Sequence, residues 1–200
     1  YNQNKSNYII GMDYVKTLIE LKKYKTAVSS LNKLHILPYE HAGEGRDLYT
    51  NAYFGSTMEE INKKDYNKAI NLINTSKEWP EQLGVGKPYN VDERIQDYLL
   101  FHCYSKLNNN KAEKYLKKVI DYSRSNINNK SFSHWLGLKS IKKLEGIEAS
   151  KKFSIQLLNS SHGSTEETKW IINNFFNTKS PINKELNQNF KIINEILMLN

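Results

Sequence analysis

Two short segments decide the fold, KYKTA at residues 23–27 and DYNKA at residues 65–69. Each places a tyrosine three residues before an alanine, and a large apolar residue follows each alanine by four positions. Residues spaced by three and four share one face of an α-helix, and a small residue on that face lets a second helix approach closely. The pattern therefore predicts the second helix of a helical hairpin at both places.

The spacing of a small and then a large residue occurs four times along the chain. The alanines lie 42, 43 and 37 residues apart, in the pairs Ala27/Leu31, Ala69/Ile73, Ala112/Leu116 and Ala149/Phe153. Repetition at such a period is the signature of stacked structural repeats. In the fourth repeat we expect Gly137, on the first helix, to lie against Ala149.

Apolar residues recur with helical spacing almost throughout the chain, and no segment alternates with the period of two that marks a strand. Asp92 is a candidate N-cap, and Ser164 with Glu167 has the spacing of a capping box. The predicted helices are 10–21, 24–34, 51–61, 66–73, 95–106, 111–122, 132–144, 147–158, one beginning after Ser164, and 186–197.

These features resemble the tetratricopeptide repeat. The matching positions are Tyr24, Tyr66, Leu136, Gly137, the four alanines, and Pro38 and Pro80 at the ends of second helices. The resemblance implies an all-α, right-handed α-α superhelix of about four hairpins. The expected repeats are 8–38, 48–80, 92–123 and 131–160, with terminal helices in 165–199 of which the last caps the stack. Residues 1–200 then form one helical-repeat domain.

The connections at 37–49 and 79–90 are longer than a solenoid requires. Each begins with an apolar residue and a proline, and each contains Gly-x-Gly followed by a cation, Arg46 or Lys87. Glycine permits a positive φ or a close approach to the backbone, and long loops on a rigid scaffold often carry function. The candidate binding residues are Tyr39, Glu40, Arg46, Trp79, Glu81, Lys87 and Tyr89.

The same two connections, within residues 15–123, also look like the repeat region of large bacterial proteins. In those proteins tetratricopeptide-like repeats follow a domain called DUF5107, which is similar to sugar-processing β-sandwich proteins. The resemblance rests on Leu37–Glu40, Arg46–Tyr49, Glu78–Glu81 and Gly84–Tyr89. It implies that the chain is the helical module of a larger bacterial protein, whose parent acts on carbohydrate. No residue matches a catalytic position of that family.

Two functions follow from these resemblances. The chain is expected to bind a partner protein or peptide, or a β-domain of its parent chain, through the aromatic faces of Tyr39, Trp79 and Tyr89. Alternatively, the loops complete a sugar site with Glu40, Glu81, Trp79 and Lys87.

Each candidate residue also has a structural interpretation. A glutamate near a helix start interacts favourably with the positive end of the helix dipole. Arg46 and Lys87 can form ion pairs with such carboxylates. Trp79 can fill a gap between consecutive hairpins. Glu40, His41 and Glu44 could ligate a metal, but the same capping role accounts for the glutamates. We therefore predict no metal and no cofactor.

Composition and charge narrow the classes of function and of binding partner that remain. The net charge is +8, but 26 of the 29 basic residues are lysine, whereas nucleic-acid recognition favours the arginine fork. Nucleic acid is therefore not the expected partner. No apolar run is long enough for a membrane span. Cys103 is the single cysteine, and His102 beside it diverges by about 100° on a helix, so the two form no catalytic dyad. The sequence therefore favours binding over catalysis for this chain alone, and enzyme activity stays open through the alternative sugar site.

Overall fold

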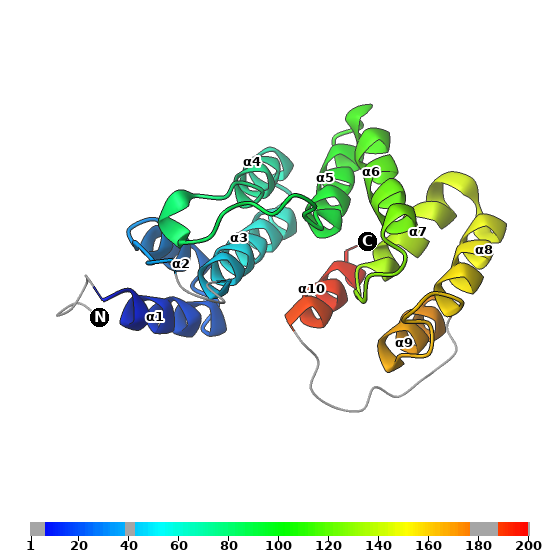
Figure 1. Cartoon of the computed structure of the whole chain (residues 1–200). Coiled ribbons are helices and arrows are strands. Elements are labelled where there is room, and N and C mark those ends of the chain that lie inside the picture. Colours follow the sequence, from blue (N-terminus) through cyan, green and yellow to red (C-terminus); the bar gives the residue numbers. More distant parts are fainter. Residues whose placement is uncertain (1–6, 39–42, 177–187, 200) are drawn as a thin grey trace. The chain divides into compact units, whose positions relative to one another are not determined.

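The computed structural model describes residues 7–38, 43–176 and 188–199, and it is all-α within these residues (Figure 1). This confirms the all-α part of the predicted fold class. The elements are α1 (Tyr8–Glu20), α2 (Tyr24–Leu31), α3 (Glu44–Asn62), α4 (Tyr66–Ser76), the short 3-10 helix η1 (Glu81–Leu83), α5 (Arg94–Lys106), α6 (Lys111–Ser125), α7 (His134–Glu145), α8 (Ile147–Leu158), α9 (Glu166–Phe175) and α10 (Gln188–Leu197). None of these helices is long and apolar enough to cross a bilayer.

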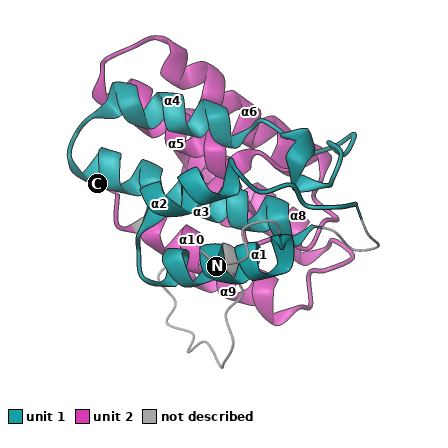
Figure 2. Cartoon of the chain, turned by 90° about the vertical axis from the view of Figure 1, so that its left-hand side faces the viewer, with its two compact units in different colours: residues 1–91 teal, residues 92–200 magenta. Residues whose placement is uncertain are grey.

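The chain divides into two compact units, residues 1–91 and 92–200 (Figure 2). In unit 1, α1 packs on α2, α2 on α3 and α3 on α4, and α1 also contacts α3. Ala27 and Ala69, the small residues of the two hairpins, are completely buried, as their spacing predicts. The ring of Tyr24 covers Gly55 of α3, where any side chain would collide with it. The tyrosine therefore packs the second helix of one hairpin onto the first helix of the next.

Unit 2 repeats this order of contacts. Helix α5 packs on α6, α6 on α7, α7 on α8 and α8 on α9. The odd-numbered helices also touch, α5 with α7 and α7 with α9. Helices α5, α7 and α9 consequently lie close enough to build a common surface.

Some predicted boundaries are wrong, and the largest difference concerns α3. It begins at Glu44 rather than at residue 51, so the first Gly-x-Gly lies at a helix start and not inside a loop. Glu44 and Asp47 occupy the first turn, where their carboxylates interact favourably with the positive end of the helix dipole. Helix α2 ends at Leu31 instead of residue 34, because the chain beyond it extends to meet the second connection.

Three local predictions also change. The cap of α9 is Thr165 rather than Ser164, and its Oγ1 accepts the backbone N–H of Thr168. The N-cap of α5 is Glu93 rather than Asp92, although Asp92 Oδ1 accepts the backbone N–H of Arg94 at 3.1 Å. Gly137 faces Ser123 and Phe153 rather than Ala149, so its missing side chain makes room for α6. The predicted start of the last helix at residue 186 lies outside the described residues.

Candidate functional site

The second long connection is part of the core of unit 1. The backbone N–H of Ile36 donates to the carbonyl of Gln82 at 2.8 Å, which ties the two connections together. Leu83 is 1% exposed and belongs to the hydrophobic core formed by α1, α2 and α3. Gly84 has a φ of +71°, and a Cβ there would lie 2.6 Å from the carbonyl oxygen of Ile36. Residues 82–84 therefore have a structural role.

Arg46 and Trp79 are the two predicted site residues that the structure brings together. The Arg46 side chain is 8% exposed, and its Nη2 donates to the carbonyl of Ser76 at 2.7 Å. Its guanidinium lies 4.5 Å from the ring centroid of Trp79 and 5.2 Å from that of Tyr49. Arg46 thus fastens the end of α4 to α3, and its stack occupies a face of Trp79 that a ligand would otherwise use.

The structure describes three of the other predicted site residues. Glu81, Lys87 and Tyr89 are exposed. Tyr39 and Glu40 lie outside the described residues, as does His41 of the alternative metal site. Among the described residues, no cluster of His, Cys, Asp or Glu has a geometry that could hold a metal ion.

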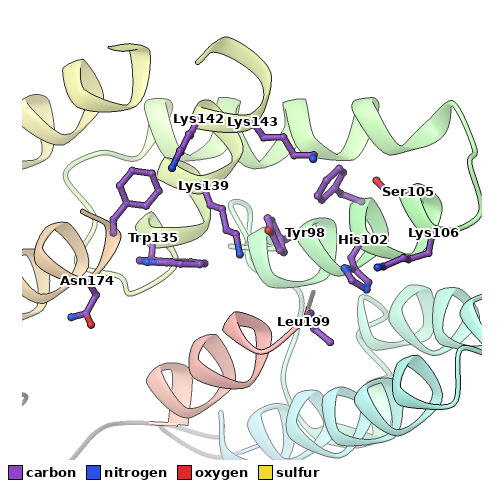
Figure 3. Close-up of a pocket in the computed structure, with 12 residues that line it drawn as sticks. Tyr98, His102, Ser105, Lys106, Trp135, Lys139, Lys142, Lys143, Asn174 and Leu199 are labelled. Atoms are coloured by element: carbon purple, nitrogen blue, oxygen red, sulfur yellow. The ribbon is translucent and has the colours of Figure 1, made fainter. Parts of the chain in front are cut away.

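Unit 2 contains a pocket that the sequence interpretation missed (Figure 3). Its volume is about 830 Å³, and the C-terminal halves of α5 and α7 and the end of α9 form most of its wall. Four aromatic residues and five basic residues dominate the lining. The lining residues are Tyr98, Phe101, His102, Ser105, Lys106, Trp135, Lys139, Lys142, Lys143, Asn174, Phe175 and Leu199.

Three of the lysines lie against the aromatic rings. Lys139 Nζ is 4.9 Å from the ring centroid of Trp135, and Figure 3 shows the two side chains together. Lys142 Nζ is 5.7 Å from the ring of Phe175, and Lys143 Nζ is 5.7 Å from that of Phe101. Cation–π contacts of this kind hold an ammonium group over an apolar surface. The pocket therefore combines an apolar wall with fixed positive charge.

This positive charge has no counter-charge in the described part of the chain. No carboxylate there lies within ion-pair distance of Lys106, Lys139, Lys142 or Lys143. Burial lowers the pKa of Lys139, and the charges of Lys143 and Lys142 lower it further. Burial also lowers the pKa of His102, with added repulsion from Lys106 and Lys139.

Helix dipoles account for some of these lysines but not for all. Lys106 lies in the last turn of α5, and Lys142 and Lys143 lie in the last turn of α7, where cations favour the negative end of the dipole. Lys139 lies before that turn and is half-buried. It is the lysine whose position the helix does not explain.

A second polar cluster, at the start of α5 and α7, is closed and structural. Arg94 is 1% exposed, and it donates to Asp92 Oδ2 at 2.7 Å and to Ser123 Oγ at 3.2 Å. Its Nη1 also donates to Nδ1 of His134 at 3.0 Å, so His134 carries its proton on Nε2 and donates it to the carbonyl of Asn129 at 2.8 Å. Burial and the charge of Arg94 lower the pKa of His134 to about 4. These groups lock three helices together.

Cys103 is likewise a core residue. It is completely buried, and burial raises the pKa of its thiol to about 12. The thiolate that nucleophilic chemistry requires is therefore absent at neutral pH.

The pocket did leave a signal in the sequence. Tyr98, Phe101, His102 and Ser105 are spaced by three, one and three along α5, and Trp135, Lys139, Lys142 and Lys143 are spaced by four, three and one along α7. Each set covers one face of its helix. Aromatic and basic residues thus recur on one face of α5 and on one face of α7, and this recurrence indicates a surface that the two helices share.

Comparison with family models, with curated proteins and with solved structures finds no match to this chain. The tetratricopeptide and DUF5107 resemblances therefore stay predictions.

Proposed function

We propose that the chain is a tetratricopeptide-like scaffold that binds a segment of another protein, and that the pocket of unit 2 is its binding site. The observation that carries this proposal is the pocket itself, in which lysines without counter-charges among the described residues lie over aromatic rings. Clefts with an apolar wall and a few convergent polar groups are the usual form of a binding site.

The order of helix contacts supports the scaffold part of the proposal. In each unit consecutive helices pack as hairpins, and odd-numbered helices also touch one another. A right-handed superhelix of stacked hairpins has this order of contacts, and such arrays bind peptides along the surface that their first helices share. In unit 2 the odd-numbered helices supply most of the pocket wall.

Binding fits the described residues of the pocket better than catalysis does. They include His102 and four lysines but no carboxylate, so they offer no acid–base pair. The partner in this proposal is a separate protein or a β-domain of a longer parent chain. The alternative sugar site in the loops stays a hypothesis that no observation favours, since the ring of Trp79 stacks on Arg46.

Selection from a random peptide library displayed on phage tests this proposal. The full chain is immobilised, and each enriched clone is measured against three variants. Lys139→Met and Phe175→Ala alter the pocket, whereas Tyr89→Ala removes an exposed ring of the second connection. We expect clones that lose binding to both pocket variants and keep it for Tyr89→Ala. Clones with the reverse dependence would move the site to the loops, and a selection without pocket-dependent clones would reject the proposal.

A further inference from the structure

We propose that the partner segment is acidic, with carboxylates flanking one aromatic or large apolar side chain. This inference rests on the proposed function, because it names the chemistry of the segment that the pocket of unit 2 binds.

The first argument is charge complementarity. Several other lysines of unit 2 do have carboxylate neighbours: Lys117 lies 2.6 Å from Glu113, Lys151 lies 2.8 Å from Glu148, and Lys169 lies 3.2 Å from Glu166. The four pocket lysines have no such neighbour among the described residues, and they are gathered around one cavity. A partner that brings carboxylates would supply what this part of the surface lacks.

The second argument concerns Lys139. A half-buried ammonium group loses hydration, and this loss is normally offset by an opposite charge. Here the charges of Lys143 and Lys142 repel that of Lys139. A bound carboxylate beside Lys139 would replace the lost hydration and relieve the repulsion, so binding energy should be concentrated at this residue.

The third argument concerns the apolar wall. The rings of Phe101, Trp135 and Phe175 lie under the lysines. Trp135 is 6% exposed, and its indole N–H is buried, so the ring contributes mainly apolar surface to the wall. A cavity of about 830 Å³ can take several side chains. The occupant is therefore amphipathic rather than uniformly charged.

Phosphate-rich polymers fit the pocket less well. Proteins hold phosphate mainly with arginine forks and helix N-termini. No arginine lines the pocket, most of its wall comes from the C-terminal parts of α5 and α7 and the end of α9, and the three arginines of the chain hold the fold. Arg46 and Arg94 are buried, and Arg124 binds Glu145 through two hydrogen bonds of 2.9 and 2.6 Å. A second copy of the chain is also disfavoured, since its net charge is +8.

The pocket-dependent clones of the peptide selection test this inference. Each peptide is synthesised with a fluorescent label, together with a matched form in which glutamine and asparagine replace glutamate and aspartate. Anisotropy then gives the affinity of the full chain. We expect acidic peptides whose neutral forms bind at least about tenfold more weakly. Lys139→Met should weaken binding of the acidic peptide most and Lys142→Gln should weaken it less, while Lys152→Gln, which alters an exposed lysine on α8, should not weaken it.

Three results would overturn the inference. If the pocket-dependent peptides are neutral, or if neutral and acidic forms bind equally, the acidic partner is wrong and the proposed function stands. If no pocket-dependent peptide exists, both are wrong. If oligothymidylate displaces the peptide at a lower concentration than unlabelled peptide does, the pocket is a site for a phosphate polymer.

Discussion

Gly84 has a left-handed backbone conformation at the point where the two long connections lie against each other. Its φ of +71° is costly for a residue with a Cβ, and that atom would lie 2.6 Å from the carbonyl oxygen of Ile36. We expect Gly84→Ala to lower the free energy of unfolding by about 2 kcal/mol or more. Gly86→Ala is the control, because Gly86 has open space around it and no positive φ. Equal urea denaturation curves for the two variants would show that residue 84 makes no such contact.

His134 makes the stability of unit 2 depend on pH. Its pKa is about 4 in the folded chain and 6.5 when unperturbed, so between these values the unfolded chain binds more protons. The stability that the neutral, buried His134 contributes is fully present above pH 6.5 and is lost as pH falls towards 4. It amounts to about 3 kcal/mol. Burial would raise the pKa of Asp92, but the hydrogen bonds and charge of Arg94 outweigh burial and lower it. Protonation of Asp92 therefore removes a further part of the stability of unit 2 at more acidic pH.

The variant His134→Asn should remove most of this pH dependence, since the asparagine oxygen can still accept from Arg94 but does not titrate. Urea denaturation of the full chain from pH 7 to pH 4 measures the effect, with the exposed His35→Asn as control. A wild-type slope that persists in His134→Asn would assign the effect to other groups.

Sequence reasoning predicted the role of some residues and not of others, for a physical reason. The burial of Ala27 follows from its place on a helical face, which is local information. The surroundings of Trp79 depend on Arg46, which lies 33 positions away in the sequence. Local spacing does not show which face of an aromatic ring another side chain covers.

At the scale of elements, η1 behaves as a core element although it lies in a loop. Leu83 is buried among side chains of α1, α2 and α3. We expect Leu83→Ala to cost about 2 to 5 kcal/mol of unfolding free energy, as for other buried leucines. Leu37→Ala, at a leucine that is 62% exposed, should change it by less than about 0.5 kcal/mol. A small effect at Leu83 in thermal or urea unfolding would mean that the connection is detached from the core.

The presence of a helix was easier to predict than the residues at which it begins and ends. The apolar spacing of three and four identified every described helix of unit 2, and α8 begins and ends where it was predicted. The start of α3 was missed by seven residues, because Gly43 and Gly45 were interpreted as loop residues. Glycine is compatible with a loop and with a helix start, so the choice depends on packing.

At the scale of the whole molecule, charge should control the binding that we propose. The chain carries a net charge of +8, and four lysines surround the pocket. Salt screens such interactions, with a Debye length of about 10 Å at 0.1 M and about 3 Å at 1 M. We expect the affinity for an acidic selected peptide to fall as sodium chloride rises, and the affinity for its neutral form to change little. An affinity that does not depend on salt would contradict electrostatic recognition.

The pocket was missed because it belongs to no single segment. Its wall combines residues 98–106, 135–143 and 174–175, which only the packing of α5, α7 and α9 brings together. The sequence interpretation instead favoured the unusual connections, of which Leu83 and Gly84 turn out to support the core.

The most direct test of the account is to find where a selected peptide lies on the chain. The peptide is made with a photoreactive benzophenone in place of its aromatic side chain, cross-linked to the full chain, and located by mass spectrometry. The account predicts cross-links in the pocket of unit 2, within residues 98–106, 135–143 and 174–175. Cross-links that cluster at residues 79–89 instead would contradict it and place the binding site in the second connection.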